Sequence, residues 1–225
     1  MFVGHYGAAY LLKKRFSQVP LWSLFVSVQL VDILTFVLVP LGIERIVYKP
    51  VPNPFLRTSL EYVPYSHSLS SNVIIALAVF LISYKLAGKA WALALLIGSV
   101  SHWFLDCLVH VGDIPLFFDS CKVGFGLWRF SRTGFLLETA FLILASLYFL
   151  RGSDKIRRHV ILIVVLVAGY MAMFLAPQAE GTPTQASVMS LTLYAVFAGL
   201  AYWAERSKPK QQTSALQPEV QDNHS

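Results

Sequence analysis

Long apolar segments alternate along this chain with short segments that carry most of its charge. A helix needs roughly 20 residues to cross the hydrocarbon layer of a membrane. Six apolar segments have about this length: 20–43, 69–87, 90–110, 134–150, 160–177 and 187–204. A seventh, residues 1–12, is too short to cross unless it tilts or the membrane thins. The pattern predicts an all-α, polytopic membrane protein with about six transmembrane helices and a short N-terminal membrane-embedded helix.

The composition agrees with this fold class. The 225 residues are 56% hydrophobic and 13% charged, whereas soluble domains carry about 25% charged residues. The net charge of +6 does not indicate nucleic-acid binding, because most basic residues lie in short clusters between apolar segments, where they orient helices in a membrane. We expect one integral membrane domain over residues 1–204, with the site in residues 1–150, and a polar, disordered tail over residues 205–225. The two cysteines, Cys107 and Cys121, are expected to be free thiols.

The basic clusters predict how the helices are oriented. If every long apolar segment crosses once, one side receives Lys13–Arg15, Lys85 and Lys89, Arg151–Arg158 and Arg206–Lys210. The positive-inside rule makes that side cytoplasmic, together with the C-terminus. Residues 44–68, 111–133 and 178–186 then face outward. The last of these carries no Lys or Arg, but the other two retain Arg45, Lys49, Arg57, Lys122, Arg129 and Arg132.

The clearest sign of chemistry is a polar stripe within the segment 90–110. His102, Asp106 and His110 follow one another at intervals of four residues. On a helix such positions share one face and drift by only about 40° per step. Ionisable groups at this depth are costly and indicate a functional site. We expect His102 and Asp106 to bind one divalent metal ion, although interhelical hydrogen bonding would also explain them. His110, at the end of the segment, either adds a ligand or faces water.

Four further groups, His5, Asp32, His67 and Glu138, fall in the outer half of the membrane or at its outer surface. This depth follows from counting about 1.5 Å per helical residue. A buried carboxylate needs a cation, a metal ion or a proton, and no Arg or Lys lies deep in any apolar segment. The sequence therefore predicts either a proton relay or a metal site with these ligands: His5, Asp32, His67, His102 and Asp106.

Nitrogen and carboxylate ligands suit zinc, manganese or iron, with zinc as the first expectation. Such an ion can polarise a phosphoryl oxygen and generate a nucleophile from water. Asp32 or Glu138 would then act as the catalytic base. Arg129 and Arg132 would hold a substrate phosphate, or they would anchor the chain at the membrane interface beside Trp128.

The order of these residues resembles the YdjM-like family of bacterial inner-membrane proteins, which are described as metal-dependent hydrolases. The resemblance is carried by Gly4-His5, Asp32, Ser66-His67-Ser68 and Gly98-x-x-Ser101-His102-x-x-x-Asp106. Two features differ. Ile33-Leu34 follows Asp32 where the family has Asp-x-Asp, and Tyr62-Val63-Pro64-Tyr65 stands where His-Arg is usual. The spacing is also similar to that of zinc-dependent phospholipase C. The resemblance implies a bacterial inner-membrane location and phosphoester chemistry.

These observations leave more than one function open. The leading expectation is a membrane-embedded, metal-dependent hydrolase of a phosphoester, with a membrane lipid or lipid-like molecule at the outer face as its substrate. A proton- or metal-ion-coupled transporter could use the same His and Asp groups as a relay, although no internal repeat or paired helix break supports it. A third possibility is a scaffold whose polar residues only join helices. It would explain one or two such residues more readily than five at one depth, namely His5, Asp32, His67, His102 and Glu138.

Overall fold

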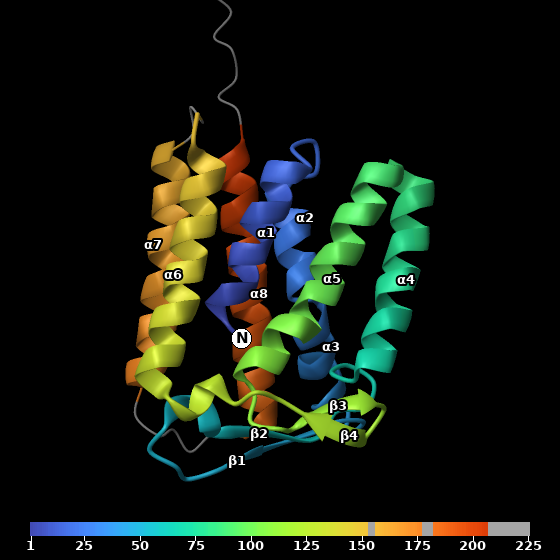
Figure 1. Cartoon of the computed structure of the whole chain (residues 1–225), viewed down its shortest axis with the longest axis vertical. Helices are drawn as coiled ribbons and strands as arrows, with labels where there is room; N and C mark the ends of the chain where they lie inside the picture. The colour runs from blue at the N-terminus through green and yellow to red at the C-terminus, as the bar shows by residue number, and fades with distance from the viewer. Residues whose placement is uncertain (153–155, 177–181, 207–225) are drawn as a thin grey trace, which may run out of the picture.

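The computed structural model describes residues 1–152, 156–176 and 182–206. Within these ranges the protein is a bundle of α-helices with two small β-hairpins at one end (Figure 1). The chain begins with the short helix α1 (Val3–Arg15) and a broken pair, α2 (Leu21–Val28) and α3 (Leu30–Leu38). Five long helices follow: α4 (Leu69–Ala87), α5 (Lys89–Val109), α6 (Ser131–Leu150), α7 (Ile156–Leu175) and α8 (Pro183–Glu205). The all-α fold class predicted from the apolar segments is confirmed.

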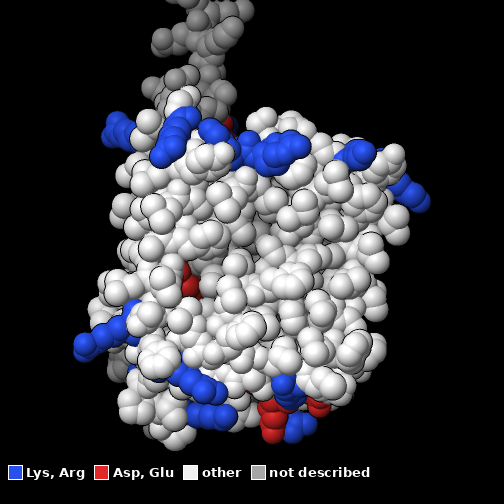
Figure 2. Space-filling model, viewed as in Figure 1, with Lys and Arg blue, Asp and Glu red and all other residues white. Residues whose placement is uncertain are grey.

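The surface of the bundle is that of a membrane protein. Five helices are long and apolar enough to cross a membrane, or six if the α2–α3 pair forms one span. Large apolar side chains such as Ile74, Leu81 and Leu144 are exposed on the outside of the bundle. Figure 2 shows a wide belt almost without charge between two ends that carry the basic residues, with one small acidic spot showing through the belt. Most of the predicted polar tail, from residue 207 onward, lies outside the described residues.

Helix α1, the segment too short to cross by itself, lies among its neighbours in the bundle (Figure 1). It packs mainly against α6, α2 and α5, and every residue from Val3 to Tyr10 is buried. Small residues allow this close approach, since a Cβ added at Gly7 would lie 2.9 Å from the Phe141 ring of α6. Small residues at helix contacts serve the same purpose in membrane proteins generally.

The apolar segment 20–43 does not form one continuous helix. Helices α2 and α3 meet at Gln29 with a bend of 54°, and Gln29 has non-helical dihedral angles, φ −107° and ψ 5°. A break in the helix leaves backbone groups near it without their usual intrahelical partners, so that other groups must satisfy them. The carbonyl of Val28, at the end of α2, accepts a hydrogen bond from His102 in this way.

The two segments expected to be outer loops each contain an antiparallel β-hairpin. Strand β1 (Arg45–Tyr48) pairs with β2 (Thr58–Tyr62), with Tyr48 opposite Thr58, and β3 (Ile114–Phe117) pairs with β4 (Ser120–Val123). Their inner residues share a small apolar cluster with helix side chains: Val39, Ile46, Leu60, Val63, Trp103 and Ile114. The hairpins therefore close one end of the bundle, beneath α3, α4 and α5 in Figure 1.

Candidate metal centre

Three separate parts of the chain bring four potential metal ligands together. Asp32 lies in the first turn of α3, where the positive end of the helix dipole favours a carboxylate. His67 lies in the turn before α4, next to Ser68, which caps that helix. His102 and Asp106 lie one turn apart on α5. One ligand atom from each of the four residues lies within 4.8 Å of all the others, so the group could hold a metal ion.

Four of the distances between these atoms are close to those around one tetrahedral ion. His102 Nε2 lies 3.1 Å from Asp106 Oδ2 and 3.7 Å from Asp32 Oδ1. His67 Nε2 lies 3.3 Å from Asp32 Oδ1 and 3.7 Å from Asp106 Oδ2. A tetrahedral ion with bonds of about 2.0–2.2 Å separates its ligand atoms by roughly 3.3–3.6 Å. The side chains would need only small adjustments to bind such an ion.

The hydrogen bond of His102 leaves its other ring nitrogen free to bind a cation. Nδ1 lies 2.7 Å from the Val28 carbonyl oxygen, so Nδ1 carries a proton, and Nε2 has an unshared electron pair when the ring is neutral. In the part of the chain that the structure describes, Nε2 has no hydrogen-bond partner although it is fully buried. Nε2 faces carboxylate oxygens, which are also acceptors, and a cation between these atoms would remove their repulsion.

His67 is oriented by a second set of polar groups. Its Nδ1 lies 2.9 Å from Thr35 Oγ1 and 3.1 Å from Ser66 Oγ. Ser66 Oγ in turn donates to Glu44 Oε2 at 2.6 Å, and Thr35 Oγ1 can donate to the Val31 carbonyl at 3.1 Å. The hydroxyl hydrogens therefore have other acceptors, and Nδ1 of His67 is the donor. Carboxylate and hydroxyl partners of this kind fix the orientation of metal-binding histidines.

Asp106 connects the four-residue group to helix α1. Its Oδ2 faces His67 and His102, while its Oδ1 lies 3.1 Å from His5 Nε2 and also accepts a hydrogen bond from the Met1 nitrogen. The His5 ring stacks on the His102 ring at 3.9 Å between centroids. The predicted ligand His5 thus lies beside the cluster, against the opposite oxygen of Asp106.

The predicted additional ligand His110 also lies at the edge of the group. Its Nε2 is 3.9 Å from Asp106 Oδ2, and its Nδ1 is 2.9 Å from Asp113 Oδ1. Burial opposes the ionisation of Asp113, but the hydrogen bond and charge of His110 outweigh burial, so the pKa of Asp113 lies below its usual value. A Cβ at Gly124 would lie 2.3 Å from the His110 carbonyl oxygen, so only glycine lets that segment pack so closely.

Glu138, predicted as a base, is fully buried and has three donors around it. Its Oε1 accepts from Trp128 Nε1 at 2.8 Å, and its Oε2 accepts from the backbone nitrogens of Phe2 and Gly4 at 2.7 and 3.4 Å. The carboxylate therefore fixes the start of α1 and the Trp128 ring. The predicted phosphate-binding residues Arg129 and Arg132 are exposed, and neither forms an ion pair with another described residue.

Several residues around the centre were not predicted from the sequence to have a role in the site. Glu44, Thr35 and Ser66 hold His67, and Asp113 holds His110. Tyr194 of α8 donates to Asp32 Oδ2 at 3.0 Å. Ser66 stands directly before His67, but nothing in the spacing of the other four indicates that they meet the cluster. Asp32 itself keeps 17% of its side chain exposed, whereas the other three members of the group are almost completely buried.

Comparisons with known proteins found no relative of this chain. The chain matches no protein-family model, and no curated protein or solved structure is significantly similar to it.

Proposed function

We propose that this protein is a membrane-embedded, metal-dependent hydrolase that acts on a phosphoester. The observation that carries the proposal is the geometry of two buried histidines, His67 and His102. In both residues Nδ1 forms a hydrogen bond to a neighbouring group, and Nε2 faces a carboxylate. A structural zinc site is closed by four ligands, often cysteines, whereas a catalytic site keeps a position open. The described residues bring no cysteine into this group.

All four residues lie within reach of one ion; in the proposed site His67, His102 and Asp106 would hold a zinc ion, and Asp32 would act on water at the remaining position. A bound divalent ion would supply Lewis acidity for the phosphoryl oxygen and would lower the pKa of a water molecule. Asp32 is the best placed base, because it adjoins both histidines, is held by Tyr194 and keeps some exposure. Glu138 is less suited to this role, since both its oxygens already accept hydrogen bonds.

The position of the centre supports a lipid or lipid-like substrate. His67 directly precedes α4 and Asp106 lies in the last turn of α5, at the ends of these helices that adjoin the hairpins (Figure 1). The positive-inside rule assigns the opposite end, with Lys13–Arg15 and Lys85, to the cytoplasm. A headgroup at the outer surface of a bacterial inner membrane would then lie close to the site.

The proposal is tested by metal content and turnover measured on the same preparations. We expect about one zinc per chain in protein purified in detergent, and chelator-sensitive hydrolysis of a model phosphodiester such as bis(4-nitrophenyl) phosphate. His102→Ala should lose the metal. Asp32→Asn should keep it and lower turnover by roughly 10²–10⁴-fold, the effect of removing a general base.

His159→Gln is the matched control, because His159 is another buried histidine but lies beside Tyr10, away from the cluster. It should keep both metal and turnover. Protein without bound metal under any condition would refute the proposal. Metal binding without hydrolysis of any phosphoester, combined with proton or metal uptake into proteoliposomes, would favour transport instead.

A further inference from the structure

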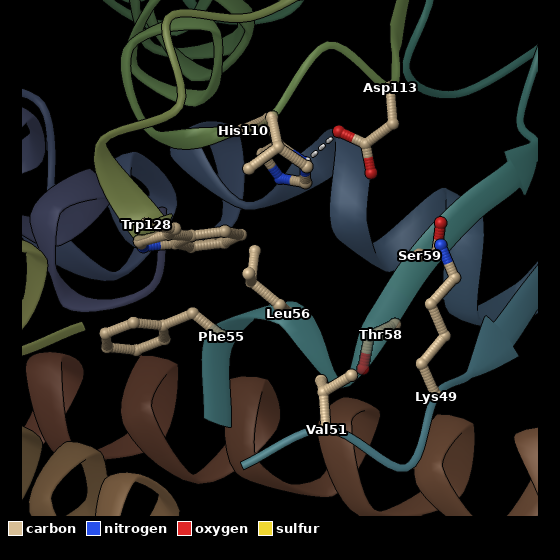
Figure 3. Close-up of a pocket in the computed structure, with 10 residues that line it drawn as sticks. Lys49, Val51, Phe55, Leu56, Thr58, Ser59, His110, Asp113 and Trp128 are labelled. Carbon is tan, nitrogen blue, oxygen red and sulfur yellow. Dashed lines mark hydrogen bonds and ion pairs between the residues drawn. The ribbon is translucent and has the colours of Figure 1, made fainter. Parts of the chain in front are cut away.

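A cavity of about 190 Å³ lies beside the metal centre, at the hairpin end of the molecule (Figure 3). The chain from β1 through β2 forms one side of it, with Lys49, Phe55, Thr58 and Ser59. The opposite side comes from the loop after α5, with His110 and Asp113, and from Trp128 of the short 3-10 helix η2 (Leu127–Arg129). Drug-sized ligands occupy pockets of about 300–1,000 Å³, so this cavity suits a small headgroup rather than a whole lipid.

The cavity and the metal centre share one wall, the imidazole of His110. On the cavity side Nδ1 of His110 bonds to Asp113 Oδ1, which Figure 3 shows at the top of the cavity. On the other side Nε2 faces Asp106 Oδ2 at 3.9 Å. Trp128, whose ring is 4.6 Å from the His110 ring, lines the cavity and donates a hydrogen bond to Glu138 at 2.8 Å. A molecule in the cavity would therefore lie next to the proposed reaction centre.

The charged groups of the cavity are not equivalent. Asp113 already accepts hydrogen bonds on both oxygens, from His110 at 2.9 Å and from the Leu60 nitrogen at 3.3 Å. Lys49 lies across the cavity from His110 (Figure 3), and it has no ion pair with any residue in the described ranges. Thr58 and Ser59, with two hydroxyl groups that can donate, line the cavity near it. Phe55 stacks on Trp128 at 5.4 Å and forms an apolar wall.

We propose that this cavity binds the substrate headgroup, and that the headgroup carries a second anionic group which Lys49 holds. This inference rests on the proposed hydrolase function, because it places the reacting phosphate at the metal centre and the headgroup behind His110. An ammonium group without a partner, next to hydroxyl donors, is suited to a phosphate or a carboxylate. The aromatic wall of Phe55 and Trp128 would contact the carbon skeleton of the headgroup.

The test compares pairs of soluble probes that differ by one anionic group. Glycerol 1-phosphate is compared with glycerol 1,3-bisphosphate, and phosphoethanolamine with phosphoserine, so that a second phosphate and a carboxylate are tested separately. Dissociation constants are measured by calorimetry on the full chain in detergent, with and without added zinc. We expect the doubly anionic member of at least one pair to bind more tightly, by about 10-fold, as a charge-assisted hydrogen bond predicts.

Two variants and one control test whether the tighter binding of the doubly anionic probe depends on Lys49 and on this cavity. Lys49→Gln should remove the roughly 10-fold advantage of the doubly anionic probe and leave its partner probe unchanged. Thr58→Tyr should weaken both members of a pair, because the larger side chain fills the cavity. Lys122→Gln removes a basic residue on β4 that pairs with Asp119 outside the cavity, and it should change neither affinity.

Equal affinities within both pairs, or equal losses in Lys49→Gln and Lys122→Gln, would refute the inference. So would a complete lack of binding by all four probes. If binding depends on Lys49 but no phosphoester is hydrolysed, the hydrolase proposal fails and the binding site stands. If phosphoesters are hydrolysed but the second anion has no effect, the binding site alone fails.

Discussion

The two oxygens of Asp106 face different groups, and this separates the histidines around it into two kinds. His102 faces the oxygen directed at the cluster, whereas His5 bonds to the oxygen on the side of α1. We therefore expect His102→Ala to abolish stoichiometric metal binding. His5→Ala should instead weaken affinity by roughly 10–100-fold, as the loss of a group that orients a ligand does. Metal competition titrations measure both, and equal losses would make His5 a direct ligand.

Glu138 provides a second prediction at the scale of single residues. The Glu138 carboxylate accepts hydrogen bonds from Trp128 Nε1 and from the Phe2 nitrogen. In Glu138→Gln the amide NH₂ group would face one of these two donors, and that donor would lose its acceptor. Leaving one buried donor unsatisfied costs about 1–3 kcal/mol. We expect a lower midpoint of thermal unfolding in detergent with one metal still bound. A variant that unfolds like the wild type but loses its metal would make Glu138 a ligand.

Among the elements, α1 depends on a close contact with α6, because its Gly7 lies against Phe141 of that helix. Gly7→Ala should destabilise the protein by about 1–3 kcal/mol, the usual cost of overpacking. It should also shift His5, two residues nearer the N-terminus of the same helix, and so reduce metal affinity. Unfolding curves and metal titrations of the same preparation measure the two effects.

Gly199→Ala is the control for this change. Gly199 lies inside α8, and a Cβ there would have no atom within 4 Å. Because alanine is the better helix former, this variant should be unchanged or more stable by roughly 0.5–1 kcal/mol. A similar loss of stability in both variants would show that contact with Phe141 is not the cause. Partial recovery in Gly7→Ala combined with Phe141→Ala would support it.

At the scale of the whole molecule, the orientation in the membrane can be tested with the natural thiol Cys121, which is exposed on β4 at the hairpin end. We expect an impermeant maleimide to label Cys121 in intact cells that carry Cys107→Ala. A cysteine at Lys14, in the basic cluster at the other end, should react only after permeabilisation when both natural cysteines are replaced. The reverse pattern would place the hairpins and the metal centre on the cytoplasmic side.

Much of this architecture could be predicted from the sequence, because it depends on local periodicity. Apolar segments of spanning length predicted the long helices, with boundaries near those observed for α4 and α5. The i, i+4 spacing predicted that His102 and Asp106 share one face, since helix geometry alone places them there. The break at Gln29 and the two hairpins were not predicted, because each is stabilised by contacts with other segments.

The sequence by itself determined the class of the molecule, the positions of its long apolar segments and the residue types that could bind a metal ion. Only the tertiary structure decided which of these residues meet. Asp32 and His67 reach His102 because α3 bends away from α2, and because the turn before α4 packs against α3 through Thr35 and His67. Glu44, Tyr194 and Asp113 join the site from other segments, and no spacing along the chain specifies those contacts. Packing between distant segments determines them, since each buried polar group must find a partner wherever the fold provides one.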